Sequence, residues 1–149
     1  MQYYCKADRI GKKQMNVEQV ELIRHSLIQV HPIADQIARS FYAHLFEVTP
    51  RLRKLFQGDM DRQGSMLMSS LELAVSNLDD PESILPAIQA LGERHLSYGV
   101  KAQDFPLSKE AYLWAMEKHL GMEFTPALKD AWAAAFDALL QAMIDVTSS

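Results

Sequence analysis

Cysteine is nearly absent from this sequence, which has 149 residues and a single cysteine, Cys5. One cysteine cannot form a disulfide within the chain, and the N-terminus lacks the apolar run of a secretory signal, so we expect a cytoplasmic protein. No stretch approaches the ~18 uninterrupted apolar residues that a membrane-spanning helix needs. The net charge of −4 gives no general attraction to nucleic acid or to anionic lipid. We therefore expect a soluble protein with neither a nucleic acid nor a membrane as partner.

Glycine and proline are also sparse, at six residues each. The apolar residues follow helical spacing almost throughout, and no alternating stretch is long enough to indicate a strand. The composition, 48% hydrophobic and 23% charged, is typical of a globular domain. These features predict an all-α fold, with residues 1–15 as an N-terminal extension and residues 16–149 as one domain.

Caps and breaks set the expected helix limits. Asn16 with Gln19 has the spacing of a capping box, Thr125 before Pro126 is a second cap, and Gly99 ends a helix. On the expected helix 106–120 we place Trp114 on the inner face with Leu107, Ala111 and Leu120, and we expect Trp114 and Trp132 to be core residues. The spacing predicts helices over about 17–30, 32–46, 50–56, 60–78, 84–98 and 106–120, and from 126 through 143.

Two polar residues lie on otherwise apolar helix stripes, His95 and Gln63. An unpaired buried polar group costs a few kcal/mol, so each needs a partner. A metal ion between the two helices would supply one, because imidazole is a good ligand for iron. A backbone carbonyl would equally satisfy a buried histidine, and spacing alone favours this simpler interpretation.

Three segments resemble the globin family: FYAHLFEVTPRLRKLFQ (41–57), LGERHLSYGVKAQDFP (91–106) and FTPALKDAWAAAFDALLQAM (124–143). The resemblance covers roughly residues 17–146 and is strongest to bacterial single-domain haemoglobins, the haem domain of flavohaemoglobins and neuroglobin-like globins. It implies a globin fold, with helices packed three-on-three around a pocket for haem b.

The resemblance also implies roles for individual residues. In the pattern H-x-x-x-G-V, His95 resembles the proximal iron ligand, and Phe56 resembles the phenylalanine that wedges the haem. Gln63 falls at the distal position and Tyr42 at the distal tyrosine position. The haem-binding residues that it implies are His95, Phe56, Tyr42, Gln63, Leu67, Leu91, Val100 and Phe105, with His95 as the metal ligand.

Tyr42 and Gln63 together imply a pocket that donates hydrogen bonds to bound dioxygen. The implied function is reversible dioxygen binding for storage, transport or scavenging, with slow release. Two simpler readings stay open: the Tyr42 hydroxyl could lie at the surface, and Gln63 could be solvated on a frayed first turn. His44, close to Tyr42, is a candidate for a ligand-entry route.

The sequence departs from flavohaemoglobins on the proximal side. Their tyrosine and glutamate, which give the proximal histidine anionic character, are matched here by Phe105 and Thr147. We therefore expect His95 to donate its other N–H to a backbone carbonyl near Leu91, with a milder effect on the iron.

Several functional questions stay open at this point. Nitric oxide dioxygenase activity is one alternative function, and gas sensing through residues 1–15 is another. Because the chain ends at Ser149, without flavin or nicotinamide domains, we expect a redox cycle to need a separate reductase. Nitric oxide and carbon monoxide are further expected ligands, and we expect a monomer or a weak homodimer.

Overall fold

The computed structural model describes residues 15–148, with side chains described through residue 145. These residues form helices and connecting turns and contain no strand, which confirms the predicted all-α class. The α-helices are α1 (Val17–Val30), α2 (Ala34–Val48), α3 (Met60–Ser76), α4 (Leu85–Ser97), α5 (Phe105–Leu120) and α6 (Pro126–Ser148). Short 3-10 segments between them include η2 (His31–Ile33), η3 (Pro50–Leu55), η4 (Pro81–Ile84), η5 (Ala102–Asp104) and η6 (Gly121–Glu123). None of the described helices is long and apolar enough to cross a membrane.

Side chains cap α1 and α6 as the sequence predicts. Asn16 Oδ1 accepts from the N–H of Gln19 at 2.8 Å, and Gln19 Oε1 accepts from the N–H of Asn16 at 3.2 Å. Before α6, Thr125 Oγ1 accepts from the N–H of Leu128 at 3.2 Å. Met15 is fully buried, whereas the rest of the expected extension, residues 1–14, lies outside the described residues.

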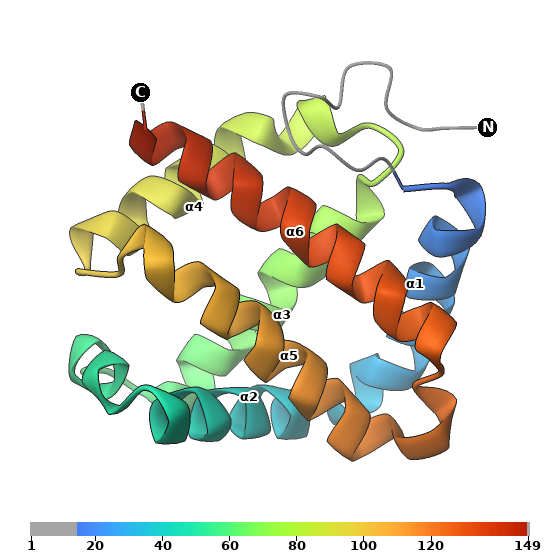
Figure 1. The fold of residues 1–149 in the computed structure, drawn as a ribbon, viewed down its shortest axis with the longest axis horizontal. Coiled ribbons are helices and arrows are strands. Elements are labelled where there is room, and N and C mark those ends of the chain that lie inside the picture. Colours follow the sequence, from blue (N-terminus) through green and yellow to red (C-terminus); the bar gives the residue numbers. More distant parts are fainter. Residues whose placement is uncertain (1–14, 149) are drawn as a thin grey trace.

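The helices cross around a shared apolar core (Figure 1). α2 packs against both α5 and α3, while α6 packs against α1, α4 and α5. Tyr112 and Trp132 are fully buried where α5 meets α6, with ring centroids 5.2 Å apart. Residues of both α3 and α4 line the candidate site.

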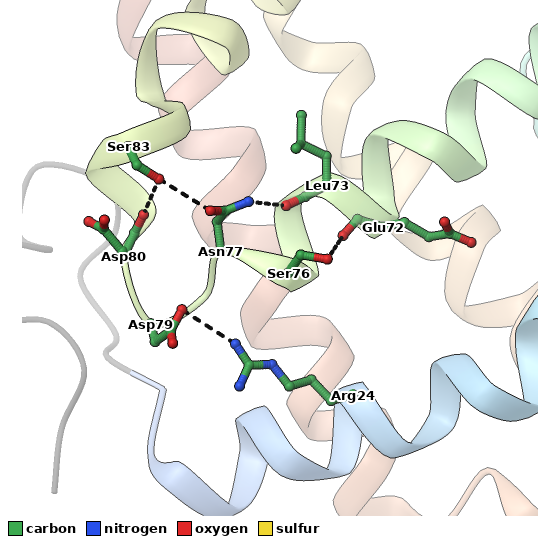
Figure 2. A network of polar contacts seen from close by, with 8 residues as sticks. All are labelled: Arg24, Glu72, Leu73, Ser76, Asn77, Asp79, Asp80 and Ser83. Atoms are coloured by element: carbon green, nitrogen blue, oxygen red, sulfur yellow. Dashed lines mark hydrogen bonds and ion pairs between the residues drawn. The ribbon is translucent and has the colours of Figure 1, made fainter.

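A polar network fixes the turn that joins α3 to α4 (Figure 2). Asn77 Nδ2 donates to the carbonyl of Leu73 at 2.9 Å. Ser83 Oγ lies 2.8 Å from the carbonyl of Asp80 and 3.2 Å from Asn77 Oδ1. Asp79 pairs with Arg24 of α1 at 3.4 Å. The turn is therefore closed on itself and held to α3 and α1.

The predicted inner face of α5 is wrong at Trp114. This side chain is 38% exposed and stacks on His44 of α2, with ring centroids 4.2 Å apart. Successive helix positions differ by about 100°, so Trp114 lies about 200° from the fully buried Tyr112. The core face of α5 is formed instead by Phe105, Ala111, Tyr112, Ala115 and Met116.

A glycine lets α4 approach α6 closely. A Cβ built on the buried Gly92 would lie 2.7 Å from the backbone oxygen of Met143. Backbone atoms cannot move aside as a flexible side chain can, so only glycine fits at this crossing. The position of α4 thus depends on the missing side chain of Gly92.

We expect Gly92→Ala to lower the free energy of unfolding by about 1–3 kcal/mol, the usual cost of overpacking a close contact. The sign is diagnostic, because alanine in place of glycine inside a helix otherwise stabilises by about 0.5–1 kcal/mol. Urea denaturation measures the difference. Glu93→Ala, at the neighbouring exposed position, should change stability by less than about 0.5 kcal/mol. A Gly92→Ala variant more stable than wild type would contradict the close approach.

Candidate functional site

A cavity lies between α2, α3, α4, α5 and α6, and its walls are mainly apolar. The structure brings all eight predicted site residues together in the lining of this one cavity: Tyr42, Phe56, Gln63, Leu67, Leu91, His95, Val100 and Phe105. His44 is not among the lining residues, so the structure gives no support to its suggested place on a ligand-entry route.

An adjoining hollow continues the cavity towards the surface. It shares Phe56, Gln63, Leu91, His95 and Val100 with the cavity and ends among exposed residues. These outer residues are Gln57, Gly58, Asp59 and Tyr98. The side chains of His95 and Gln63 therefore lie along a passage that runs from solvent to the interior.

α3 presents two different faces to its surroundings. Gly64, Met68 and Val75 are buried, whereas Gln63 and Leu67 are half-buried and line the cavity. Residues three and four apart share one side of a helix, so Gln63 and Leu67 lie one above the other. Helical spacing thus puts a polar and an apolar side chain on the same side of α3, and both line the cavity.

The proximal side of the cavity is built around His95 of α4. Its Nδ1 lies 2.8 Å from the carbonyl oxygen of Leu91, one turn earlier. A carbonyl only accepts, so Nδ1 carries the proton and Nε2 keeps its lone pair. The predicted contact with a carbonyl near Leu91 is confirmed, and it leaves Nε2 available as a metal ligand.

Burial lowers the pKa of His95, an effect that exceeds the opposing influence of the hydrogen bond to Leu91. The positive charge of Arg94 lowers this pKa further. The ring is therefore neutral at physiological pH, which is the form that binds a metal.

The chain turns sharply after His95. The N–H of Val100 donates to the carbonyl of His95 at 3.0 Å, and Gly99 has a φ of +100°. A left-handed residue that closes a helix is usually glycine, because a Cβ is strained there. Gly99 thereby directs Val100 into the cavity wall, as the H-x-x-x-G-V pattern predicts.

The distal side is formed by Tyr42 and Gln63. Tyr42 is 8% exposed, and its ring lies within aromatic contact distance of Phe41, Phe46 and Phe56. Burial raises the pKa of Tyr42 to about 12, and a hydrogen bond with the Gln63 side chain partly offsets this rise. The hydroxyl stays protonated at neutral pH, so both residues present hydrogen-bond donors. Neither simpler reading holds: the tyrosine is buried, and the glutamine has a protein partner.

Phe105 supports the proximal side without a polar group. Its ring centroid lies 6.0 Å from that of His95, and its side chain is buried. A phenylalanine cannot hydrogen-bond to the imidazole, so this contact only packs. The other matching position, Thr147, has a side chain outside the described residues.

These residues fit an iron porphyrin. One imidazole nitrogen is free to ligate a metal, two hydrogen-bond donors line the same cavity, and the lining is mainly apolar, which suits a flat macrocycle. Arg94 lines the cavity beside His95, and its positive charge would suit an acidic group at the edge of the porphyrin.

The chain matches a known family over most of its length. The family model described as Globin matches residues 39–143. This chain therefore belongs to the globin family, and the helical arrangement described above is the globin fold that the resemblance implied.

Relatives include the Flavohemoprotein of Bordetella parapertussis, 29% identical over 113 residues that cover 74% of this chain and 28% of that protein. The Flavohemoprotein of Bacillus subtilis is 25% identical over 130 residues, which cover 85% of this chain and 33% of that protein. The chain thus spans about a third or less of the length of these relatives.

Two solved structures are similar in fold. One is an engineered carbene transferase derived from a presumed nitric oxide dioxygenase of Rhodothermus marinus, with a TM-score of 0.77 and 29% identity, covering 85% of this chain and 88% of that one. The other is a bacterial globin from Campylobacter jejuni, with a TM-score of 0.80 and 20% identity, covering 89% of this chain and 96% of that one.

Several lining residues were not predicted from the sequence. Leu139, Leu140 and Met143 of α6 belong to a general apolar stripe, so no local signal separates wall from core. Asp104 lacks any signal, because an aspartate in a turn is usually solvated. The unpredicted lining residues also include Ser70, Ser108 and Phe136.

The lowered pKa of His95 predicts a pH effect on the metal-free protein. The unfolded state takes up a proton near pH 6.5 and the folded state only at lower pH, so stability falls as pH drops from about 6.5 through the folded pKa. Denaturation of apoprotein at a series of pH values should show this loss in wild type. The loss should be smaller in His95→Gln and unchanged in His25→Gln, whose side chain is exposed. Equal pH profiles for wild type and His95→Gln would contradict a depressed pKa.

Proposed function

We propose that this globin holds one haem b through Nε2 of His95 and binds dioxygen reversibly. The observation that carries the proposal is the single cavity that joins a neutral imidazole, its tautomer fixed by Leu91, to two hydrogen-bond donors, Tyr42 and Gln63. The Flavohemoprotein relatives support the choice of haem as the cofactor. Haem, when bound there, would supply an iron atom able to bind a diatomic gas.

The distal residues act on the gas through hydrogen bonds. Tyr42 is clamped by its aromatic neighbours, so its hydroxyl is pre-oriented and little rotational freedom is lost when it donates. Gln63 supplies an amide N–H from the adjacent helix. These donors favour a ligand with partial negative charge on its outer atom, such as dioxygen, over the nearly apolar carbon monoxide. Their strength sets how slowly the gas leaves.

The proximal side favours binding over bond cleavage. His95 is supported by a neutral carbonyl and packed against Phe105, and none of the residues whose side chains the structure describes gives it a hydrogen-bonded carboxylate that would make the imidazole more anionic. A weakly donating histidine gives little push towards splitting an oxygen–oxygen bond. This side chain environment suits storage, delivery or scavenging of dioxygen.

Variants at the distal residues test the proposal. A charge-assisted hydrogen bond contributes about 1.5–3 kcal/mol, so Tyr42→Phe and Gln63→Leu should each release dioxygen about 10-fold faster or more. Stopped-flow displacement of dioxygen by carbon monoxide measures the rate. Glu47→Gln, an exposed change in the same helix as Tyr42, is the control and should release it at the wild-type rate. His95→Ala should fail to retain haem.

The outcome that would remove the proposal is a wild-type protein that does not take up haem, or one that oxidises in air within seconds instead of holding dioxygen. Release rates unchanged in both distal variants would keep haem binding and reject the assigned roles of Tyr42 and Gln63.

Nitric oxide dioxygenase activity is a second candidate, favoured by the 29% identical structure derived from a presumed nitric oxide dioxygenase. In this reaction dioxygen, nitric oxide and one electron give nitrate, so every turnover needs an electron donor. The donor class we propose is a flavin reductase, in keeping with the names of the Flavohemoprotein relatives. Nitrate formed in many equivalents with an added flavin reductase would support the enzyme, and one equivalent only would support the binding protein.

A further inference from the structure

A buried carboxylate joins two corners of the molecule beside the cavity. Asp104 is 3% exposed and is the last residue of η5. Its Oδ1 pairs with Nη2 of Arg51 in η3, and its Oδ2 accepts from the N–H of Lys101 at 2.9 Å. One carboxylate therefore closes its own turn and ties that turn to a segment 53 residues earlier.

Both corners carry cavity residues. η3 is followed directly by Phe56, and the turn that Asp104 closes lies between Val100 and Phe105, with all of these side chains in the cavity lining. Asp104 itself lines the cavity. The same corners also lie close together at a second point, because the Leu55 side chain fills the space that a Cβ on Gly99 would need, 3.2 Å from Leu55 Cδ2.

The buried charge of Asp104 contributes little to the stability of the fold. Desolvation of a buried carboxylate largely offsets the attraction of its partner, so such pairs are poor general stabilisers. They hold geometry, however, because the charge is satisfied in only one arrangement of its donors. The exposed pair of Lys109 and Asp137 elsewhere in the structure carries no such constraint.

We propose that Arg51 and Asp104 are positioning residues that lock the turn after α4 to the corner after α2. The lock sets the separation between Phe56 on one corner and Val100 on the other, and so the width of the cofactor slot beside His95. This inference rests on the proposed function in that it assigns haem to the slot. Neither residue is proposed to contact the iron or the gas.

The two partners differ in exposure, which predicts an asymmetry. The Arg51 side chain is 44% exposed and can return to water, whereas Asp104 cannot. Arg51→Met therefore leaves a charge buried without its partner. Asp104→Asn leaves a hydrated arginine and keeps an oxygen to accept from Lys101. Arg51→Met should therefore loosen the two corners more than Asp104→Asn does. Adding Asp104→Asn to Arg51→Met should restore part of the lost restraint.

The experiment compares Arg51→Met, Asp104→Asn, the double variant and Lys109→Met in the full chain. Lys109→Met breaks an ion pair between α5 and α6 whose residues do not line the cavity. The first readout is the rate of haem transfer to an excess of a haem-free acceptor globin. The second is amide hydrogen exchange of residues 98–106 in the haem-free protein.

We expect Arg51→Met to lose haem at least about 10-fold faster than wild type. This change corresponds to a free-energy barrier to haem release that is lower by roughly 1.4 kcal/mol or more. Exchange should rise in residues 98–106 and stay near wild type in α1. Asp104→Asn should show smaller changes, the double variant should fall between the two, and Lys109→Met should match wild type.

Two results would overturn the lock. One is a rate of haem loss and a hydrogen exchange in Arg51→Met equal to those in Lys109→Met. The other is hydrogen exchange in Arg51→Met that rises equally along the whole chain, because this would indicate general destabilisation. If the wild-type protein binds no haem, the proposed function fails, while the exchange measurement still decides whether the two corners are locked.

Discussion

The hydrogen bond from Nδ1 of His95 to the carbonyl of Leu91 decides the chemistry of the cavity. It fixes the tautomer, the ring orientation and the nitrogen left for a ligand. It can act only because α4 lies where it does, and that position depends on Gly92, which lets the helix meet the backbone of α6 at Met143. A close helix crossing thus places the imidazole, and a local hydrogen bond leaves its Nε2 free for the iron in the proposed function.

The two sides of the cavity are built on different principles. The proximal side offers one neutral acceptor and an aromatic ring, so it holds the histidine without charging it. The distal side concentrates the hydrogen-bond donors, with Tyr42 held by three phenylalanine rings. This division fits the proposed binding of dioxygen, because hydrogen-bond donors would slow release of the gas whereas an uncharged proximal histidine would give little activation.

The cavity walls come from segments far apart in the sequence, so a cofactor slot of constant width needs connections between them. The turn joining α3 to α4 is held by Asn77, Ser83 and the pair of Asp79 with Arg24 (Figure 2). The opposite corners are joined by Arg51 with Asp104 and by Leu55 against Gly99. Apolar contacts have no preferred direction, so they do not fix the spacing of the cavity walls. The polar groups at the edges of the cavity supply that restraint.

The sequence by itself determined the features that depend on neighbours within one or two helical turns. These include the cap of Asn16 with Gln19, the cap at Thr125, the helix end at Gly99 and the bond from His95 to Leu91, all confirmed. The family motifs added the eight residues that line one cavity. Only the tertiary structure decided the exposed stack of Trp114 on His44, the contact of Tyr42 with Gln63 and the pairing of Arg51 with Asp104. The physical reason is that helical periodicity gives a residue's angle on its own helix, whereas its partner depends on how separate helices cross.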